Sequence, residues 1–189
     1  MKPSGLNAIA LQVGGKLTKI DPDFAKEVPN LEELSVSGQA LSKIDNLPKG
    51  VIVLNAHCNK LTEWPTLPNK STRHLGLSGN LIQTLDSLPR EVAAGYSNLF
   101  SLDLSMNRLC AMHDIKPLLY LPAIRILSLH DNPICLLHDY RQRVVSSIPT
   151  LETFDNQQVV SPTPEPWTLS APDPNTLNLG TCLPQTSSL

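Results

Sequence analysis

The strongest constraint on the fold of this chain is a pattern of apolar residues and one asparagine that recurs along most of its length. The clearest copy occupies residues 124–134 and reads Ile-x-x-Leu-x-Leu-x-x-Asn-Pro-Ile. Alternating apolar residues of this kind are typical of a short strand with one buried face. The asparagine follows where the chain turns out of the strand, and its amide can satisfy backbone groups that the turn leaves unpaired. Each copy therefore predicts one strand followed by one asparagine-supported turn.

Four further copies precede this one. The five first positions are residues 31, 51, 72, 99 and 124, so successive copies begin 20, 21, 27 and 25 residues apart. Repeats of this length are typical of solenoids, in which each repeat forms one coil. Three positions depart from the pattern, because Gln39 replaces the asparagine and Ala56 and Thr72 replace larger apolar residues. The sequence predicts a right-handed α/β leucine-rich-repeat solenoid of five to six coils, with a parallel sheet on its concave side.

The segments between the predicted strands also repeat, because Leu-Pro recurs at 47–48, 67–68 and 88–89. Proline at this phase ends the returning segment before the next strand, where its missing N–H is not needed. Residues 90–98 are extra length in the third repeat, and we expect a short helix or a loop there.

The chain divides into four predicted parts. Residues 1–30 are expected to form a degenerate N-terminal repeat or cap, followed by the repeats at 31–136. Residues 137–160 include apolar residues at helical spacing and are expected to cap the last open coil. Residues 161–189 contain six prolines in 29 residues and predict an extended tail.

Composition excludes several classes of function. The formal net charge of -2 gives no basic footprint for nucleic acid or an anionic membrane. The four cysteines form no C-x-x-C motif and indicate reduced, cytosolic thiols. The apolar patch at 6–13 is too short for a signal peptide or a membrane span. Gly14-Gly15-Lys16 lacks the residues of a phosphate-binding loop, and no cofactor is expected.

The predicted strands place a row of side chains on the concave face, where we expect a helix or an extended segment of a larger protein to bind. This face has no aromatic residues or charge clusters among the positions assigned to it. Small residues, Ser105 and Gly76 among them, are expected to leave room for a partner backbone, with Ser105 pointing to solvent. The predicted partner-binding residues are Glu33, Ser35, Ser37, Asn55, His57, His74, Ser78, Ser101, Asp103, Ser105, Ser128 and His130.

The predicted geometry argues against catalysis and metal binding on this face. Asp103, Ser105 and His130 have the residue types of a catalytic triad, but an open sheet offers no oxyanion hole and no enclosure for a substrate. His57 and His130 are three strands apart, ~14 Å, which is too far to share a metal ion. Trp64 is predicted to be a core residue, whereas Trp167 in the proline-rich tail is predicted to contact a partner.

Two sets of residues resemble known families. One set resembles the C-terminal cap of the SDS22-like repeat class: Tyr140-Arg141, Val144, Ile148-Pro149-x-Leu151 and Phe154-Asp155. That class includes a phosphatase regulator, the spliceosomal U2 A-prime protein and axonemal dynein light chain 1. The leucine-rich-repeat-containing protein 43 family is similar over about residues 15–165, on the basis of 31–34, 74–77, 98–104, the long third repeat and 159–162.

The second resemblance implies a place in motile cilia. It implies a non-catalytic scaffold subunit of an axonemal complex, located in the cytoskeleton of the cilium or flagellum and assembled with larger axonemal proteins. The chain also resembles the small subunit of the C1a projection of the central apparatus. Two alternatives stay open, an adaptor of a nuclear ribonucleoprotein and a regulator of a phosphatase. Neither nucleic acid nor membrane is expected as a direct partner.

Overall fold

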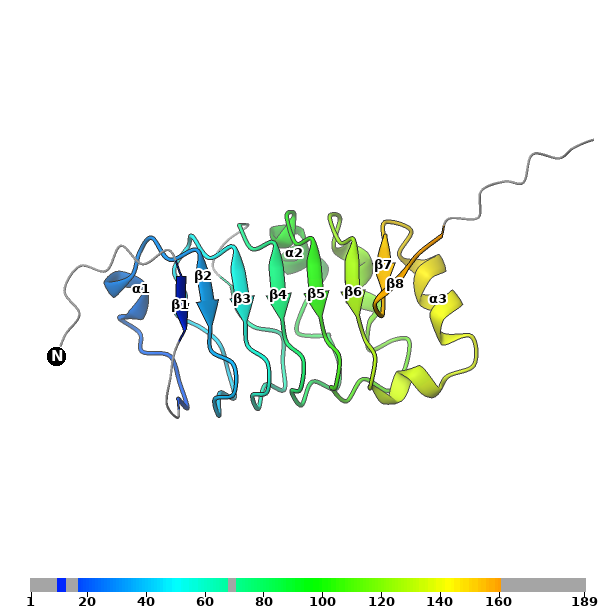
Figure 1. Ribbon diagram of the computed structural model, residues 1–189, viewed down its shortest axis with the longest axis horizontal. Helices are drawn as coiled ribbons and strands as arrows, with labels where there is room; N and C mark the ends of the chain where they lie inside the picture. Colours follow the sequence, from blue (N-terminus) through cyan, green and yellow to red (C-terminus); the bar gives the residue numbers. More distant parts are fainter. Residues whose placement is uncertain (1–9, 13–16, 68–70, 161–189) are drawn as a thin grey trace, which may run out of the picture. The chain divides into compact units, whose positions relative to one another are not determined.

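The computed structural model describes residues 10–12, 17–67 and 71–160, and within them eight strands lie side by side in chain order in one sheet (Figure 1). The first seven strands pair in parallel, and the eighth is antiparallel to the seventh. The predicted leucine-rich-repeat solenoid with a parallel sheet is therefore confirmed. The strands are β1 (Ala10–Gln12), β2 (Glu33–Ser35), β3 (Val53–Asn55), β4 (His74–Gly76), β5 (Ser101–Asp103), β6 (Ile126–Ser128), β7 (Thr153–Phe154) and β8 (Gln157–Gln158).

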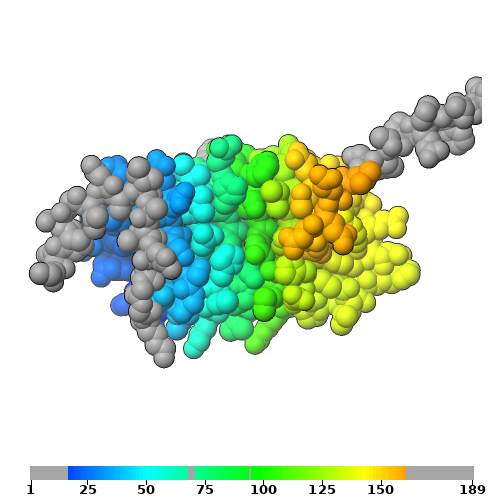
Figure 2. All heavy atoms as spheres, in the orientation of Figure 1, coloured from blue at the N-terminus to red at the C-terminus, as the bar shows by residue number. Residues whose placement is uncertain are grey.

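The coils stack because their buried strand residues are in register. The middle residue of each repeat strand pairs with the middle residue of the next, and the series ends on the phenylalanine of β7. Burial of each such side chain contributes about 1.5–3 kcal/mol, and neighbouring coils share every layer. Figure 2 shows the coils of residues 17–159 as successive bands. The series is Leu34, Leu54, Leu75, Leu102, Leu127 and Phe154, each no more than 2% exposed.

The asparagine of each repeat is buried and ties its coil to the preceding one. The Oδ1 of Asn107 accepts the Ile82 N–H at 3.1 Å, and its amide donates to the carbonyls of Leu77 at 2.9 Å and Leu104 at 3.0 Å. The asparagines therefore satisfy the turn backbone as predicted. The same set of bonds is made by Asn59, Asn80 and Asn132.

Two residues that depart from the repeat pattern also make hydrogen bonds to the backbone. The Oε1 of Gln39 accepts the Leu17 N–H at 2.7 Å, and its amide donates to the Ser37 carbonyl at 3.3 Å. Gln39 thus replaces the asparagine of its coil. The hydroxyl of Thr72 donates to the Val51 carbonyl at 3.1 Å, so this buried polar group is satisfied at an apolar site.

The extra length of the third repeat forms α2 (Arg90–Ala93) and η1 (Ala94–Tyr96), behind the sheet in Figure 1. Tyr96 packs edge-on against Trp64 with the ring centres 5.5 Å apart, and its hydroxyl donates to the Pro65 carbonyl at 3.1 Å. Trp64 is buried, so its predicted place in the core is confirmed.

The remaining helices are short and lie between strands or at the end of the sheet. Of the helices that the structure describes, none is long and apolar enough to cross a bilayer. Cys58, Cys110 and Cys135 are free thiols. The helices are α1 (Phe24–Glu27), η2 (Lys116–Tyr120), η3 (Pro133–Leu136) and α3 (Tyr140–Ser147).

The C-terminal end of the sheet is closed by α3, β7 and β8. Arg141 of α3 donates from Nη1 to the Phe154 carbonyl at 2.9 Å, and its guanidinium lies over the Phe154 ring, with Cζ 5.5 Å from the ring centre. These contacts hold α3 against the last coil and cover its core.

Candidate protein-binding face

The candidate site is the outward face of β2 to β6, called the sheet face below. In each of these strands the buried middle residue lies between two outward residues, as in β5, where Ser101 and Asp103 flank Leu102. Strand register places the outward residues in rows. The first row is Glu33, Val53, His74, Ser101 and Ile126; the second is Ser35, Asn55, Gly76, Asp103 and Ser128; and the residues after the strands add Ser37, His57, Ser78, Ser105 and His130.

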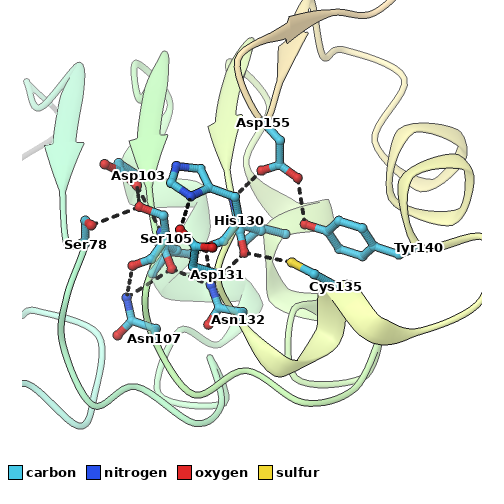
Figure 3. A network of polar contacts seen from close by, with 12 residues as sticks. Ser78, Asp103, Ser105, Asn107, His130, Asp131, Asn132, Cys135, Tyr140 and Asp155 are labelled. Atoms are coloured by element: carbon cyan, nitrogen blue, oxygen red, sulfur yellow. Dashed lines mark hydrogen bonds and ion pairs between the residues drawn. The ribbon is translucent and has the colours of Figure 1, made fainter.

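Ser105 lies inside a polar network and is only 2% exposed (Figure 3). Its hydroxyl donates to Asp103 Oδ1 at 2.6 Å and lies 2.9 Å from the Ser78 hydroxyl of the preceding coil. Its N–H donates to the same carboxylate oxygen at 2.9 Å. The prediction that Ser105 points to solvent is wrong, because a short side chain after the strand reaches back to the carboxylate two residues earlier.

The three triad residue types come near one another without forming a triad. Asp103 accepts directly from Ser105, while His130 Nδ1 contacts Asp131 Oδ2 at 2.9 Å (Figure 3). In a catalytic triad the histidine would lie between the serine and the carboxylate. Within the described part of the chain, no group of three or more His, Cys, Asp or Glu side chains is placed to hold a metal ion.

The middle of the sheet face is filled at Gly76. A Cβ added there would overlap the imidazole Nε2 of His57 and would lie 3.1 Å from Asn55 Oδ1. The prediction that Gly76 leaves room for a partner backbone is therefore wrong. The His57 ring from the neighbouring coil already occupies the space above the glycine.

The structure adds two apolar residues to the predicted face, at the edge of the sheet where the strands begin. Phe100 immediately precedes β5 and is half-buried, with its ring 6.2 Å from that of His74. Ile52, immediately before β3, has the same place in its repeat. The predicted face comprises only the positions between and after the strand leucines, so Ile52 and Phe100 fall outside it. Ile52 and Phe100 lie next to three residues of the first row, and we call the five together the apolar edge: Ile52, Val53, His74, Phe100 and Ile126.

Two arginines, Arg73 and Arg125, lie beside the apolar edge. Backbone bonds place Arg73 between Ile52 and Phe100, since its N–H donates to the Ile52 carbonyl and its carbonyl accepts from Phe100, both at 2.8 Å. Arg73 is exposed, and its side chain has no ion pair or hydrogen bond with any residue that the structure describes. Arg125, beyond Phe100, is 3.5 Å from Glu152 through Nε and Oε1.

The predicted site residues therefore fall into three groups. The outward positions of the strands lie on one face as predicted, and Ser105 and Gly76 lie on it but are closed. Trp167, the predicted tail contact, lies outside the described residues. Phe100 could have been found from the sequence, because it is a large apolar residue at the second position of its repeat, immediately before the strand.

The in-register leucines, the asparagine ladder and the closing cap define a leucine-rich-repeat protein, and this chain belongs to that class. Within the class, its sequence is similar to human leucine-rich repeat-containing protein 43, with 34% identity over 148 residues. The match covers 75% of this chain and 22% of that protein, so the chain spans about a fifth of its length. No protein-family model matches the chain.

Two other relatives have names that refer to different cellular settings of their own. The U2 small nuclear ribonucleoprotein A' of Candida glabrata is 33% identical over 66% of this chain and 47% of its own length. Human cilia- and flagella-associated protein 410 is 36% identical over 44% of this chain and 31% of its own length. Among solved structures, the Drosophila melanogaster SNF/U2A' complex has a chain that matches with a TM-score of 0.67 at 23% identity, covering 77% of this chain and 87% of that chain. At this level of sequence identity the similarity shows a shared fold and nothing about function.

Proposed function

We propose that this chain is a non-catalytic scaffold subunit of a motile-cilium axonemal complex, and that it binds a segment of a larger protein on its sheet face. The observation that carries the binding role is the apolar edge with the exposed Arg73 between two of its members. Aromatic residues and arginine are enriched in the centres of protein interfaces, where a few residues supply most of the binding energy. Phe100 and Arg73 have this combination.

The ciliary setting is supported by the resemblance to leucine-rich repeat-containing protein 43, which implies a place in motile cilia, and by the similarity to a cilia- and flagella-associated protein. Within the axoneme we propose the C1a projection of the central apparatus, on the resemblance to its small subunit.

A second candidate function is an adaptor in a nuclear ribonucleoprotein, which the similarity to the U2 A' protein favours. Such an adaptor would use the same sheet face to hold an RNA-binding protein. The two candidates differ in cellular location, because an axonemal scaffold accumulates in the cilium and a ribonucleoprotein adaptor in the nucleus.

The test expresses the tagged full chain in ciliated cells that lack the native protein. We expect the wild type in isolated axonemes, and we expect Arg73→Glu and Phe100→Ala to reduce its axonemal occupancy severalfold. Arg108→Glu is the matched control, because it makes the same charge change at an exposed site outside the sheet face. Nuclear accumulation with no axonemal signal would favour the ribonucleoprotein adaptor. Normal assembly of both face variants would reject the sheet face as the anchor.

A further inference from the structure

A groove lies on the part of the molecule formed by η2 and α3. Its volume is about 640 Å³, within the range of about 300–1,000 Å³ typical of sites that enclose a ligand. The apolar side chains that line it include Met112, Ile115, Leu119 and Ile148. Leu119 is 46% exposed, which is high for a large aliphatic residue. None of these residues belongs to the sheet face, so the groove is a separate surface.

The two cationic side chains at the groove lack partners among the described residues, whereas its carboxylate has one. Lys116 of η2 and Arg143 of α3 both line it and are exposed, and neither side chain has an ion pair or hydrogen bond with any part of the chain that the structure describes. The carboxylate at the groove, Asp139, is already 2.8 Å from His138 Nε2 through Oδ2. The groove therefore offers two free cations to a ligand and one carboxylate that already has a partner.

These cations come from the two elements that form the groove, one from each. A ligand that lies in the groove can therefore place its apolar side chains against Leu119 and the part-buried Met112 while its carboxylates reach Lys116 and Arg143. A segment with only charge would leave the apolar lining exposed to water, and a segment with only apolar residues would leave both cations unpaired. The lining is too apolar, and the cations too few, for a nucleic-acid backbone.

We infer that this groove binds an acidic amphipathic segment of another protein, with its apolar side chains between η2 and α3 and its carboxylates on Lys116 and Arg143. Docking of an amphipathic segment into an apolar groove is a recurring mode of peptide recognition. The inference goes beyond the proposed function, because it gives the chain a second binding surface. A scaffold with two such surfaces can hold two proteins at once.

The experiment measures binding of two synthetic helical peptides to the full chain by fluorescence anisotropy. Both peptides carry leucines along one face; one has glutamates beside them and the other has lysines at the same positions. We expect the glutamate peptide to bind at least about tenfold more tightly, and its affinity to fall as salt is added. The double variant Lys116→Glu/Arg143→Glu should reverse this preference. Leu119→Ser should weaken the binding of both peptides.

Arg73→Glu is the control, because it changes the sheet face and leaves the groove intact. Loss of the proposed sheet-face function would leave the peptide preference unchanged, so the two proposals fail separately. Equal binding of the two peptides, or no reversal in the double variant, would overturn the inference. It would also be overturned by a dimer that dissociates in the double variant, or by equally tight, charge-dependent binding of a peptide that spans residues 163–173 of this chain. Circular dichroism of each variant confirms that the exposed substitutions leave the fold intact.

Discussion

The carboxylate of Asp155 accepts the Tyr140 hydroxyl through Oδ2 at 3.0 Å and the Leu129 N–H through Oδ1 at 2.7 Å (Figure 3). The second bond is the one that the repeat asparagines make to the preceding coil, as Asn132 does to the Leu109 N–H. Asp155 therefore takes the place of an asparagine at the end of the asparagine ladder, where its carboxylate can accept hydrogen bonds but has no amide to donate them. Its other oxygen binds Tyr140 of the capping helix α3.

Asp155→Ala removes both bonds and leaves the Leu129 N–H and the Tyr140 hydroxyl without these partners. An unsatisfied buried polar group costs about 1–3 kcal/mol, so we expect the free energy of unfolding to fall by about 2–4 kcal/mol. Tyr140→Phe removes one of the two bonds and should cost about 1 kcal/mol. Urea unfolding followed by circular dichroism measures both. Equal losses for the two variants would mean that the Leu129 bond contributes nothing to the cap.

Alkaline pH should destabilise the fold partly through the same tyrosine. Burial, followed by the neighbouring charge of Asp155, raises the pKa of Tyr140. Since the folded state holds this proton more tightly than the unfolded state, the contribution to stability is complete below the ordinary tyrosine pKa of about 10 and is lost as the pH rises above it. The pKa of Tyr96 is also raised, mainly by burial, so this residue contributes in the same direction.

The measurement is the Tm of the wild type and of Tyr140→Phe at neutral pH and at several values above pH 10. The wild-type Tm should fall more steeply with pH than that of the variant, which keeps only the Tyr96 contribution. Parallel curves would show that Tyr140 titrates alike in the folded and unfolded states.

The repeat pattern itself predicts the effect of core truncation. Leu104 is fully buried at the third leucine position of its repeat. Leu104→Ala should lower the free energy of unfolding by about 2–5 kcal/mol, and the loss should reach neighbouring coils because each layer is shared. Met106, two residues later, is 56% exposed, and Met106→Ala should change stability by less than about 0.5 kcal/mol. Hydrogen exchange resolved by residue shows how far the loss spreads; a change below about 1 kcal/mol for Leu104→Ala would contradict this packing.

How far the sequence predicts this molecule depends on how local each feature is. Leu104 and Asn107 follow from a pattern within one repeat, because every coil uses those positions alike. The closed state of Ser105 and Gly76 depends on which side chain the adjacent coil places beside them, Ser78 in one case and His57 in the other. Side chains from adjacent coils meet there, and the repeat consensus leaves those positions free to vary.

The groove was still less accessible to sequence reasoning. It requires α3 to lie beside η2, and Leu119, the most exposed apolar residue of its lining, reads in the sequence as an ordinary core position. Leu119 is exposed because η2 turns it away from the core that Leu118 enters. In a short 3-10 helix, adjacent residues point in different directions, and tertiary packing decides which of them faces the core.

The final prediction separates open from closed positions of the sheet face. Ser105→Arg should destabilise the fold by several kcal/mol, since it places a cation at a site that is 2% exposed and breaks the bonds to Asp103 and Ser78. Ser101 is outward and half-buried, at the start of β5 beside the apolar edge. Ser101→Arg should therefore keep the Tm near that of the wild type and should weaken the proposed assembly into the axoneme by steric and charge conflict with a bound segment. Thermal unfolding of both variants, with the axonemal occupancy of Ser101→Arg, decides the matter. A folded Ser105→Arg protein with wild-type stability would show that the network around Asp103 opens at little cost, and Ser105 would then return to the binding face.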